Sequence, residues 1–328
     1  MGDSDPMRTL VREIILAAGM IGLLVLAMWA HTGSMPPLVV VESNSMQHDS
    51  SGEVGTIDAG DLVLVHSPDS NIIITFAEAT DPESQHFGYE SLGMEGDVII
   101  YERNGESDST PIIHRALFKV TIGESTPTNE EGECPEYVVL WQDECITSWT
   151  VPGSNQVDVE SINLIFDGNE TGKYACGGVA AQHGSGWFSV ESFTPSNPGY
   201  ITLGDNNDCN DDQGVFEFAP GLNSLHSGVI KPVQEDWVIG ISGAEIPWLG
   251  TVKLMVSGGD SPGVSQVPGS SFIFLILFIG AVLATPMLIE PLINKVLRNS
   301  PEVIEAERES AIAQKTADIE LTINFEEE

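Results

Sequence analysis

Three short sequence motifs in this chain, here called boxes, carry polar residue types that could together perform nucleophilic catalysis. The first is residues 43–46 (Ser-Asn-Ser-Met), the second is residues 112–115 (Ile-Ile-His-Arg), and the third is residues 204–212 (Gly-Asp-Asn-Asn-Asp-Cys-Asn-Asp-Asp). A serine hydroxyl is a weak nucleophile at neutral pH and needs a base within hydrogen-bond reach. An imidazole suits this role because its ordinary pKa lies near neutrality, and a carboxylate beside it fixes its tautomer.

Within these boxes, Ser45 is the candidate nucleophile and His114 is the candidate general base. Either Asp205 or Asp211 could orient the histidine, and the residues alone leave both open. Each box is weak by itself, because serine-rich turns and single histidines on strands are common. Acidic and amide side chains in a loop also bond to their own backbone and so stabilise an ordinary turn. The information therefore lies in the ordered set of boxes.

Two other residues could compete with His114 as the base. His48 follows Ser45 closely, and Lys119 lies in the same apolar run as His114. The offset from His114 to Lys119 is odd, so on a strand the two side chains point to opposite faces. We therefore favour His114.

The elements that must position these boxes are predicted to be strands. Runs of branched apolar residues, bounded by Gly, Pro, Asn and Asp, are typical of strands and turns. They occur at residues 38–41, 61–65, 97–101, 112–120 and 251–256. The part of the chain between residues 31 and 260 shows no convincing amphipathic helix. The pattern predicts a mainly β fold.

Two apolar segments flank this β-rich part and are predicted to be transmembrane helices. Residues 14–30 carry no charge and, at about 1.5 Å per residue, approach the thickness of a hydrocarbon core. Trp29 lies at the outer end, where interfacial aromatic residues are common. Residues 271–293 form the second candidate. A cleaved signal peptide is the alternative for the first segment, since basic residues precede it.

Basic residues flank both spans on their outer sequence sides, namely Arg8, Arg12, Lys295 and Arg298. The positive-inside tendency then places both termini in the cytoplasm of a two-pass protein in the cell membrane. The predicted organisation is a cytoplasmic tail (1–13), a transmembrane helix (14–30), an extracytoplasmic catalytic core (31–122 and 200–260), an inserted β-rich subdomain (123–199), a transmembrane helix (271–293) and an acidic cytoplasmic tail (294–328).

The charge balance excludes some classes of partner. The chain has 49 acidic and 12 basic side chains, a formal net charge of −37. This excess argues against nucleic-acid binding, which needs a basic surface, and against docking on anionic lipid through a polybasic patch. The acidic residues are spread along the chain, which indicates a solvated surface.

The four cysteines are Cys134, Cys145, Cys176 and Cys209. None forms a CxxC pair, so a zinc site is not expected. Three disulfide pairings are possible, and free cysteines in a core are an equal alternative. Segment 123–199 holds three of these cysteines.

The order of the boxes resembles the type I signal peptidases, specifically the archaeal and endoplasmic-reticulum branch, in which a histidine replaces the lysine base of the bacterial enzymes. A membrane segment, the Ser-x-Ser-Met box, an Ile-His-Arg strand and a Thr-x-Gly-Asp-Asn-Asn loop follow one another here. Flanking stretches such as residues 58–63 (Asp-Ala-Gly-Asp-Leu-Val) and 246–250 (Ile-Pro-Trp-Leu-Gly) are similar as well. The resemblance covers roughly residues 14–65, 94–121 and 200–256.

This resemblance implies a membrane-anchored serine endopeptidase that removes signal peptides from exported preproteins, next to the protein-export channel and the lipid bilayer. No metal or cofactor is implied. Ser45 would be the nucleophile and His114 the general base, while Asp205 and Asp211 match the family's two acidic positions. An oxyanion hole is implied from the Ser45 backbone N–H and the Ser43 hydroxyl, which would donate to the developing charge.

Several positions depart from the family pattern. Asn44 stands where glycine is usual, Leu203 replaces a common lysine, and the spacing from His114 to Gly204 is longer than in compact members. Segment 123–199 is therefore expected to be an insertion. The alternative function is a non-catalytic, membrane-anchored surface or adhesion module, in which this segment would carry the binding.

Overall fold

The computed structural model describes residues 6–47, 55–167, 187–207, 210–215, 230–257 and 263–298, together with 305, 308–310, 312 and 315. The chain divides into two compact units, residues 1–272 and residues 273–328. The first unit holds all the strands described here. The last long helix, α5 (Gly269–Arg298), contributes most of its length to the second unit.

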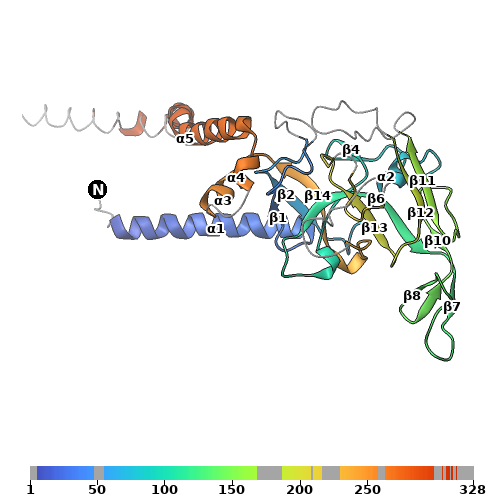
Figure 1. Ribbon diagram of the computed structural model, residues 1–328. Helices are drawn as coiled ribbons and strands as arrows, with labels where there is room; N and C mark the ends of the chain where they lie inside the picture. The colour runs from blue at the N-terminus through green and yellow to red at the C-terminus, as the bar shows by residue number, and fades with distance from the viewer. Residues whose placement is uncertain are drawn as a thin grey trace, which may run out of the picture. The chain divides into compact units, whose positions relative to one another are not determined.

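A seven-stranded antiparallel sheet forms the centre of the first unit (Figure 1). Its strands follow the order β1-β2-β14-β5-β6-β10, and β13 also pairs with β6. The predicted mainly β fold is thereby confirmed, and four of the five predicted runs coincide with β1, β2, β5 and β6. The strands are β1 (Leu38–Val40), β2 (Leu62–His66), β5 (Val98–Tyr101), β6 (Ile112–Ile122), β10 (Trp149–Thr150), β13 (Gly199–Leu203) and β14 (Val238–Ile246).

Three smaller antiparallel sheets accompany the main one in the described part of the chain. The strands β7 and β8 lie beyond β10 (Figure 1), and both pair with β9. A disulfide joins Cys134, in the segment between β7 and β8, to Cys145 of β9. Cys176 and Cys209 lie outside the described residues. The strands are β3 (Glu90–Ser91), β4 (Met94–Glu95), β7 (Ser125–Pro127), β8 (Val139–Trp141), β9 (Glu144–Ile146), β11 (Ile162–Asp167) and β12 (Trp187–Phe193).

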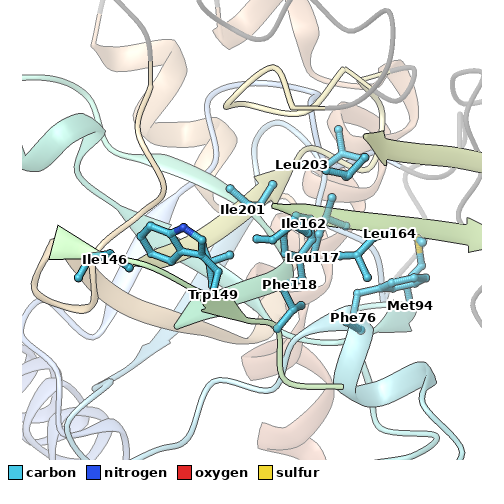
Figure 2. Packing of buried hydrophobic residues seen from close by; sticks show 14 residues of the cluster. Phe76, Met94, Leu117, Phe118, Ile146, Trp149, Ile162, Leu164, Ile201 and Leu203 are labelled. Atoms are coloured by element: carbon cyan, nitrogen blue, oxygen red, sulfur yellow. The ribbon is translucent and has the colours of Figure 1, made fainter. Parts of the chain in front are cut away.

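The largest hydrophobic cluster joins segment 123–199 to the main sheet. Trp149 and Ile162 come from this segment and pack with Phe118 of β6 and Ile201 of β13 (Figure 2). All four side chains are buried, and removing such apolar surface from water is the main stabilising contribution to a fold. The segment predicted to be an insertion therefore shares its core with β6 and β13, the two strands that lead to the polar boxes.

Residues 251–256 were predicted to be a strand, and this prediction is wrong. They form helix α3 (Gly250–Val256). Thr251 and Leu254 are buried while Val256 is 81% exposed, so burial follows the helical spacing of three residues. Branched side chains favour strands only where they pack on a pleated surface, and here the buried face of the helix packs through Leu254 against Ala59 and Val267 instead.

Helix α2 (Phe76–Thr80) lies in a region where the sequence analysis expected no helix. Its first turn is closed by a capping box, in which Glu78 N–H donates to Thr75 Oγ1 (3.2 Å) and Thr75 N–H donates to Glu78 Oε2 (3.1 Å). The Thr-x-x-Glu signal for such a box was present in the sequence. The remaining short helical turns are η1 (Arg103–Gly105), η3 (Glu235–Trp237) and α4 (Gly263–Gln266).

Helix α1 (Pro6–Thr32) contains the first apolar segment. Its part from Leu10 to Thr32 is the one helix, among the described residues, that is long and apolar enough to cross a membrane. It begins before and ends after the predicted span 14–30. A shorter apolar helical stretch, Gly269–Thr285, lies in α5.

Candidate active site

Ser45 lies in a tight turn that follows β1. The turn is closed by a hydrogen bond from Gln47 N–H to the Asn44 carbonyl (3.1 Å), and the buried side chain of Met46 anchors it in a small apolar cluster. On the other side, Asn206 N–H donates to the Ser45 carbonyl (2.8 Å). These contacts hold the half-buried Ser45 hydroxyl at the rim of the sheet.

His114 lies on β6, where it pairs with Ile99 of β5, and only 3% of its surface is exposed. Its Nε2 atom is 2.9 Å from Ser45 Oγ. This is an ordinary hydrogen-bond distance, and a general base needs such a contact to take the serine proton. The structure therefore brings the candidate nucleophile and the candidate base together.

The carboxylate behind His114 belongs to Asp212. Asp212 Oδ2 lies 2.6 Å from His114 Nδ1, and the Asp212 side chain is fully buried. A carboxylate can only accept, so Nδ1 carries a proton and Nε2 is left as the acceptor that faces Ser45. Ser45, His114 and Asp212 form one continuous hydrogen-bonded line, and we call these three residues the catalytic line.

Asp205 and Asp211 are the two predicted orienting acids, and the structure gives this contact to Asp212 instead. Asp205 accepts from Arg115, with Nε to Oδ1 at 3.0 Å and Nη2 to Oδ2 at 2.7 Å. The Asp211 carboxylate accepts the backbone N–H of Val215, at 3.0 Å from each oxygen.

A backbone hydrogen bond explains why Asp212, and not Asp205 or Asp211, contacts His114. Asp212 N–H donates to the carbonyl of Thr202 on β13 (2.9 Å), which places Asp212 alongside the strand next to β6. Nothing in the spacing of the acidic residues reveals which of them makes such a contact. Asp212 belonged to the predicted loop but was not selected.

Gly204 lies where the serine turn and β6 meet the loop after β13. A Cβ atom at this position would lie 2.7 Å from His114 Nε2 and 2.8 Å from the Ser45 carbonyl oxygen. Real Cβ atoms essentially never approach other atoms so closely. Only glycine therefore allows Ser45 and His114 to approach each other at this point.

Both groups predicted for an oxyanion hole lie on the turn that carries the nucleophile. Ser43 Oγ is 3.2 Å from Ser45 Oγ. Among the described residues, the backbone N–H of Ser45 has no intramolecular acceptor. Two potential donors thus flank the hydroxyl, and their role in binding an oxyanion stays a prediction.

Two hydroxyl groups that the sequence analysis missed also reach Asp212. Tyr101 of β5 and Thr202 of β13 each donate to Asp212 Oδ2 at 2.6 Å. Burial raises the pKa of the Tyr101 phenol well above its ordinary value, and the charge of Asp212 adds to this shift. Tyr101 ends the predicted strand 97–101, but no sequence signal linked it to the acid.

The alternative base Lys119 is engaged elsewhere. Its Nζ atom forms an ion pair with Glu235 and lies 5.2 Å from the centre of the Tyr200 ring. The other alternative, His48, lies outside the described residues.

Among the residues that the structure describes, no group of three or more His, Cys, Asp or Glu side chains is arranged to hold a metal ion. A cavity of about 770 Å³ lies between α2 and residues 153–156 and 163–165, and no residue of the catalytic line contributes to its lining.

No protein-family model matches the chain, and no curated protein sequence matches it.

Proposed function

We propose that this chain is a membrane-anchored serine endopeptidase similar to the type I signal peptidases of the archaeal and endoplasmic-reticulum type. The observation that carries the proposal is the catalytic line, with 2.9 Å between Ser45 and His114 and 2.6 Å between His114 and Asp212. Three segments far apart in sequence meet in this line with the polarity that a nucleophile, a base and an orienting acid require. A surface module without catalysis has no need of this alignment.

These contacts support the following reaction. Ser45 Oγ attacks the carbonyl carbon of the scissile peptide bond while His114 Nε2 takes the hydroxyl proton, and Asp212 stabilises the imidazolium. The negative oxygen of the tetrahedral intermediate accepts hydrogen bonds from the Ser45 N–H and the Ser43 hydroxyl. His114 then gives its proton to the leaving amine as the C–N bond breaks. A water molecule, deprotonated by His114, then attacks the ester carbonyl, and His114 returns this proton to Ser45 Oγ as the ester C–O bond breaks and the acid product leaves.

The substrate that the family resemblance implies is the signal peptide of an exported preprotein, with small residues at the positions one and three before the cut. Strand β1, which leads into the Ser45 turn, lies at one end of the sheet order and pairs only with β2 among the described strands. We propose that its other edge accepts an extended peptide by strand addition. A peptide bound there lies next to the nucleophile.

The membrane arrangement is part of the proposal. The end of α1 is tied to the sheet because Ser67 N–H, just after β2, donates to the carbonyl of Thr32 (2.9 Å). Strand β1 begins soon afterwards, so a bilayer around α1 lies close to Ser45. We take the stretch Gly269–Thr285 of α5 as the second anchor, with both termini in the cytoplasm of a two-pass protein. The fold then becomes a signal-peptidase-like β core with an inserted β-rich subdomain between two transmembrane helices.

The test is cleavage of a model preprotein by the full-length protein in detergent. We expect the wild type to cleave, and Ser45→Ala and His114→Ala each to lose cleavage while their thermal unfolding stays cooperative. Lys119→Ala is the matched control and should retain cleavage, because Lys119 pairs with Glu235 and not with the nucleophile. Retained cleavage in Ser45→Ala, or no cleavage of several preproteins by the wild type, would overturn the proposal.

A further inference from the structure

The Asp212 carboxylate has an uneven set of partners. His114 Nδ1, the Tyr101 hydroxyl and Thr202 Oγ1 each lie 2.6 Å from the same oxygen, Oδ2. The other oxygen, Oδ1, is buried and has no hydrogen-bond partner within the described part of the chain. The orientation of the carboxylate therefore depends on the groups that meet at Oδ2.

The direction of each hydrogen bond can be worked out from the neighbouring groups. Gln213 Nε2 donates to Thr202 Oγ1 (3.3 Å), while Gln213 Oε1 accepts the Thr202 backbone N–H (2.9 Å). Thr202 Oγ1 also lies 3.0 Å from the Tyr101 hydroxyl, but its contact with Asp212 Oδ2 is shorter, at 2.6 Å, and a carboxylate oxygen can only accept, so Thr202 donates to Asp212. The Tyr101 phenol is fully buried and its pKa is raised by burial and by the Asp212 charge, so it keeps its proton and also donates.

We infer that Tyr101 is a positioning residue that sets how much negative charge Asp212 presents to His114. This inference rests on the proposed function but adds a residue to it that none of the polar boxes contains. A hydrogen bond donated to a carboxylate draws charge away from the side that faces the imidazole. Tyr101 and Thr202 therefore weaken the attraction between Asp212 and a protonated His114, and they also hold Oδ2 in line with Nδ1.

The variant Tyr101→Phe removes the donor and leaves the ring in its hydrophobic cluster. Without this donor, more charge faces the imidazolium, so protonation of His114 becomes easier. We expect the midpoint of the His114 titration to rise by about half to one pH unit, since a charged hydrogen bond contributes enough free energy for a shift of this size. The measurement is ¹⁵N NMR of histidine-labelled full-length protein in detergent, with the His114 signals assigned by their loss in His114→Gln.

The matched control is Tyr200→Phe. Tyr200 is a buried tyrosine in the same hydrophobic cluster as Tyr101, but it lies beside Lys119. The same chemical change there should leave the His114 midpoint in place. Thr202→Val removes the other hydroxyl donor and should raise the midpoint as Tyr101→Phe does.

Kinetics supply a second readout. Because the Tyr101 hydroxyl helps to hold Oδ2 in line with His114 Nδ1, Tyr101→Phe should loosen this alignment and lower kcat about tenfold. Tyr101 is buried, so KM should stay within about twofold, and the acidic limb of kcat/KM should move to higher pH. An unchanged His114 midpoint in folded Tyr101→Phe, or an equal shift in Tyr200→Phe, overturns the inference. The NMR titration does not depend on peptidase activity, so failure of the proposed function and failure of this inference are separate outcomes.

Discussion

Arg115 and Asp205 form a fully buried ion pair immediately beside the catalytic line, with 2.7 Å between Nη2 and Oδ2. Arg115 follows His114 on β6, and Asp205 follows Gly204 in the loop after β13. A further donor, Nη1 of Arg115, bonds backbone carbonyls of the β3–β4 hairpin, including that of Gly96 (2.7 Å). The pair thus locks the loop that supports Ser45 onto the strand that carries His114.

Asp205→Ala should therefore lower the stability of the folded protein. Removing one partner of a buried ion pair leaves an uncompensated charge, which costs about 3–5 kcal/mol of unfolding free energy. Chemical denaturation monitored by circular dichroism measures this loss, with Asp69→Ala in the exposed turn after β2 as the control. A variant as stable as the wild type but inactive would mean that Asp205, and not Asp212, is the catalytic acid.

Asp212→Asn should instead lower the catalytic rate. The amide cannot hold the histidine tautomer as the carboxylate does, so kcat should fall by roughly 10³- to 10⁴-fold, as when the orienting acid of a known Ser-His-Asp triad is replaced. The matched control is Asp211→Asn, because the Asp211 carboxylate accepts a backbone N–H of Val215 and not the histidine. Preprotein cleavage rates of both variants decide the question, and a larger loss in Asp211→Asn would contradict the assignment.

Gly204→Ala should separate Ser45 from His114. The added methyl group would lie 2.7 Å from His114 Nε2, so the ring or the serine turn must move. Misplacement of reacting groups by about 1 Å costs on the order of 100-fold in rate, and we expect kcat to fall by that much. Gly269→Ala is the control, since its Cβ position has open space around it. Wild-type cleavage by Gly204→Ala would show that the observed contact is not needed for catalysis.

The pH dependence of stability should reflect Glu245 on β14. Burial, together with the nearby charge of Asp61, raises the pKa of Glu245 to about 7 from 4.5, although a hydrogen bond from Gly55 N–H opposes the shift. The folded state then binds a proton more tightly than the unfolded state. This contribution to stability is present below about pH 4.5 and is lost as the pH rises through about 7.

Glu245→Gln keeps an acceptor for Gly55 but cannot ionise. We expect the variant to unfold at a higher temperature than the wild type at pH 8, with the difference shrinking towards pH 5. Thermal unfolding of full-length protein across this range measures the effect. Glu106→Gln, an exposed position, is the control. An unchanged pH profile in Glu245→Gln would show that another group carries the dependence.

Much of the framework follows from the sequence by itself. The strands β2, β5 and β6 appear as branched apolar runs between turn residues because local propensity and burial agree there. Helix α1 could be predicted because an uncharged apolar stretch of membrane length is typical of a transmembrane helix. Ser45 and His114 could be selected together because a hydroxyl, an imidazole and acidic residues complement one another chemically, and because the order of their motifs resembles that of the type I signal peptidases.

The tertiary structure decided the rest. Asp205, Asp211 and Asp212 are chemically equivalent, and their partners depend on where the loop backbone docks: the Thr202 carbonyl binds Asp212 N–H, and Arg115 takes the carboxylate of Asp205. Residues 251–256 form a helix whose buried face packs against Ala59 and Val267, and neither contact can be read from the local sequence. Side-chain partners across distant segments arise from backbone docking and core packing, which sequence spacing does not contain.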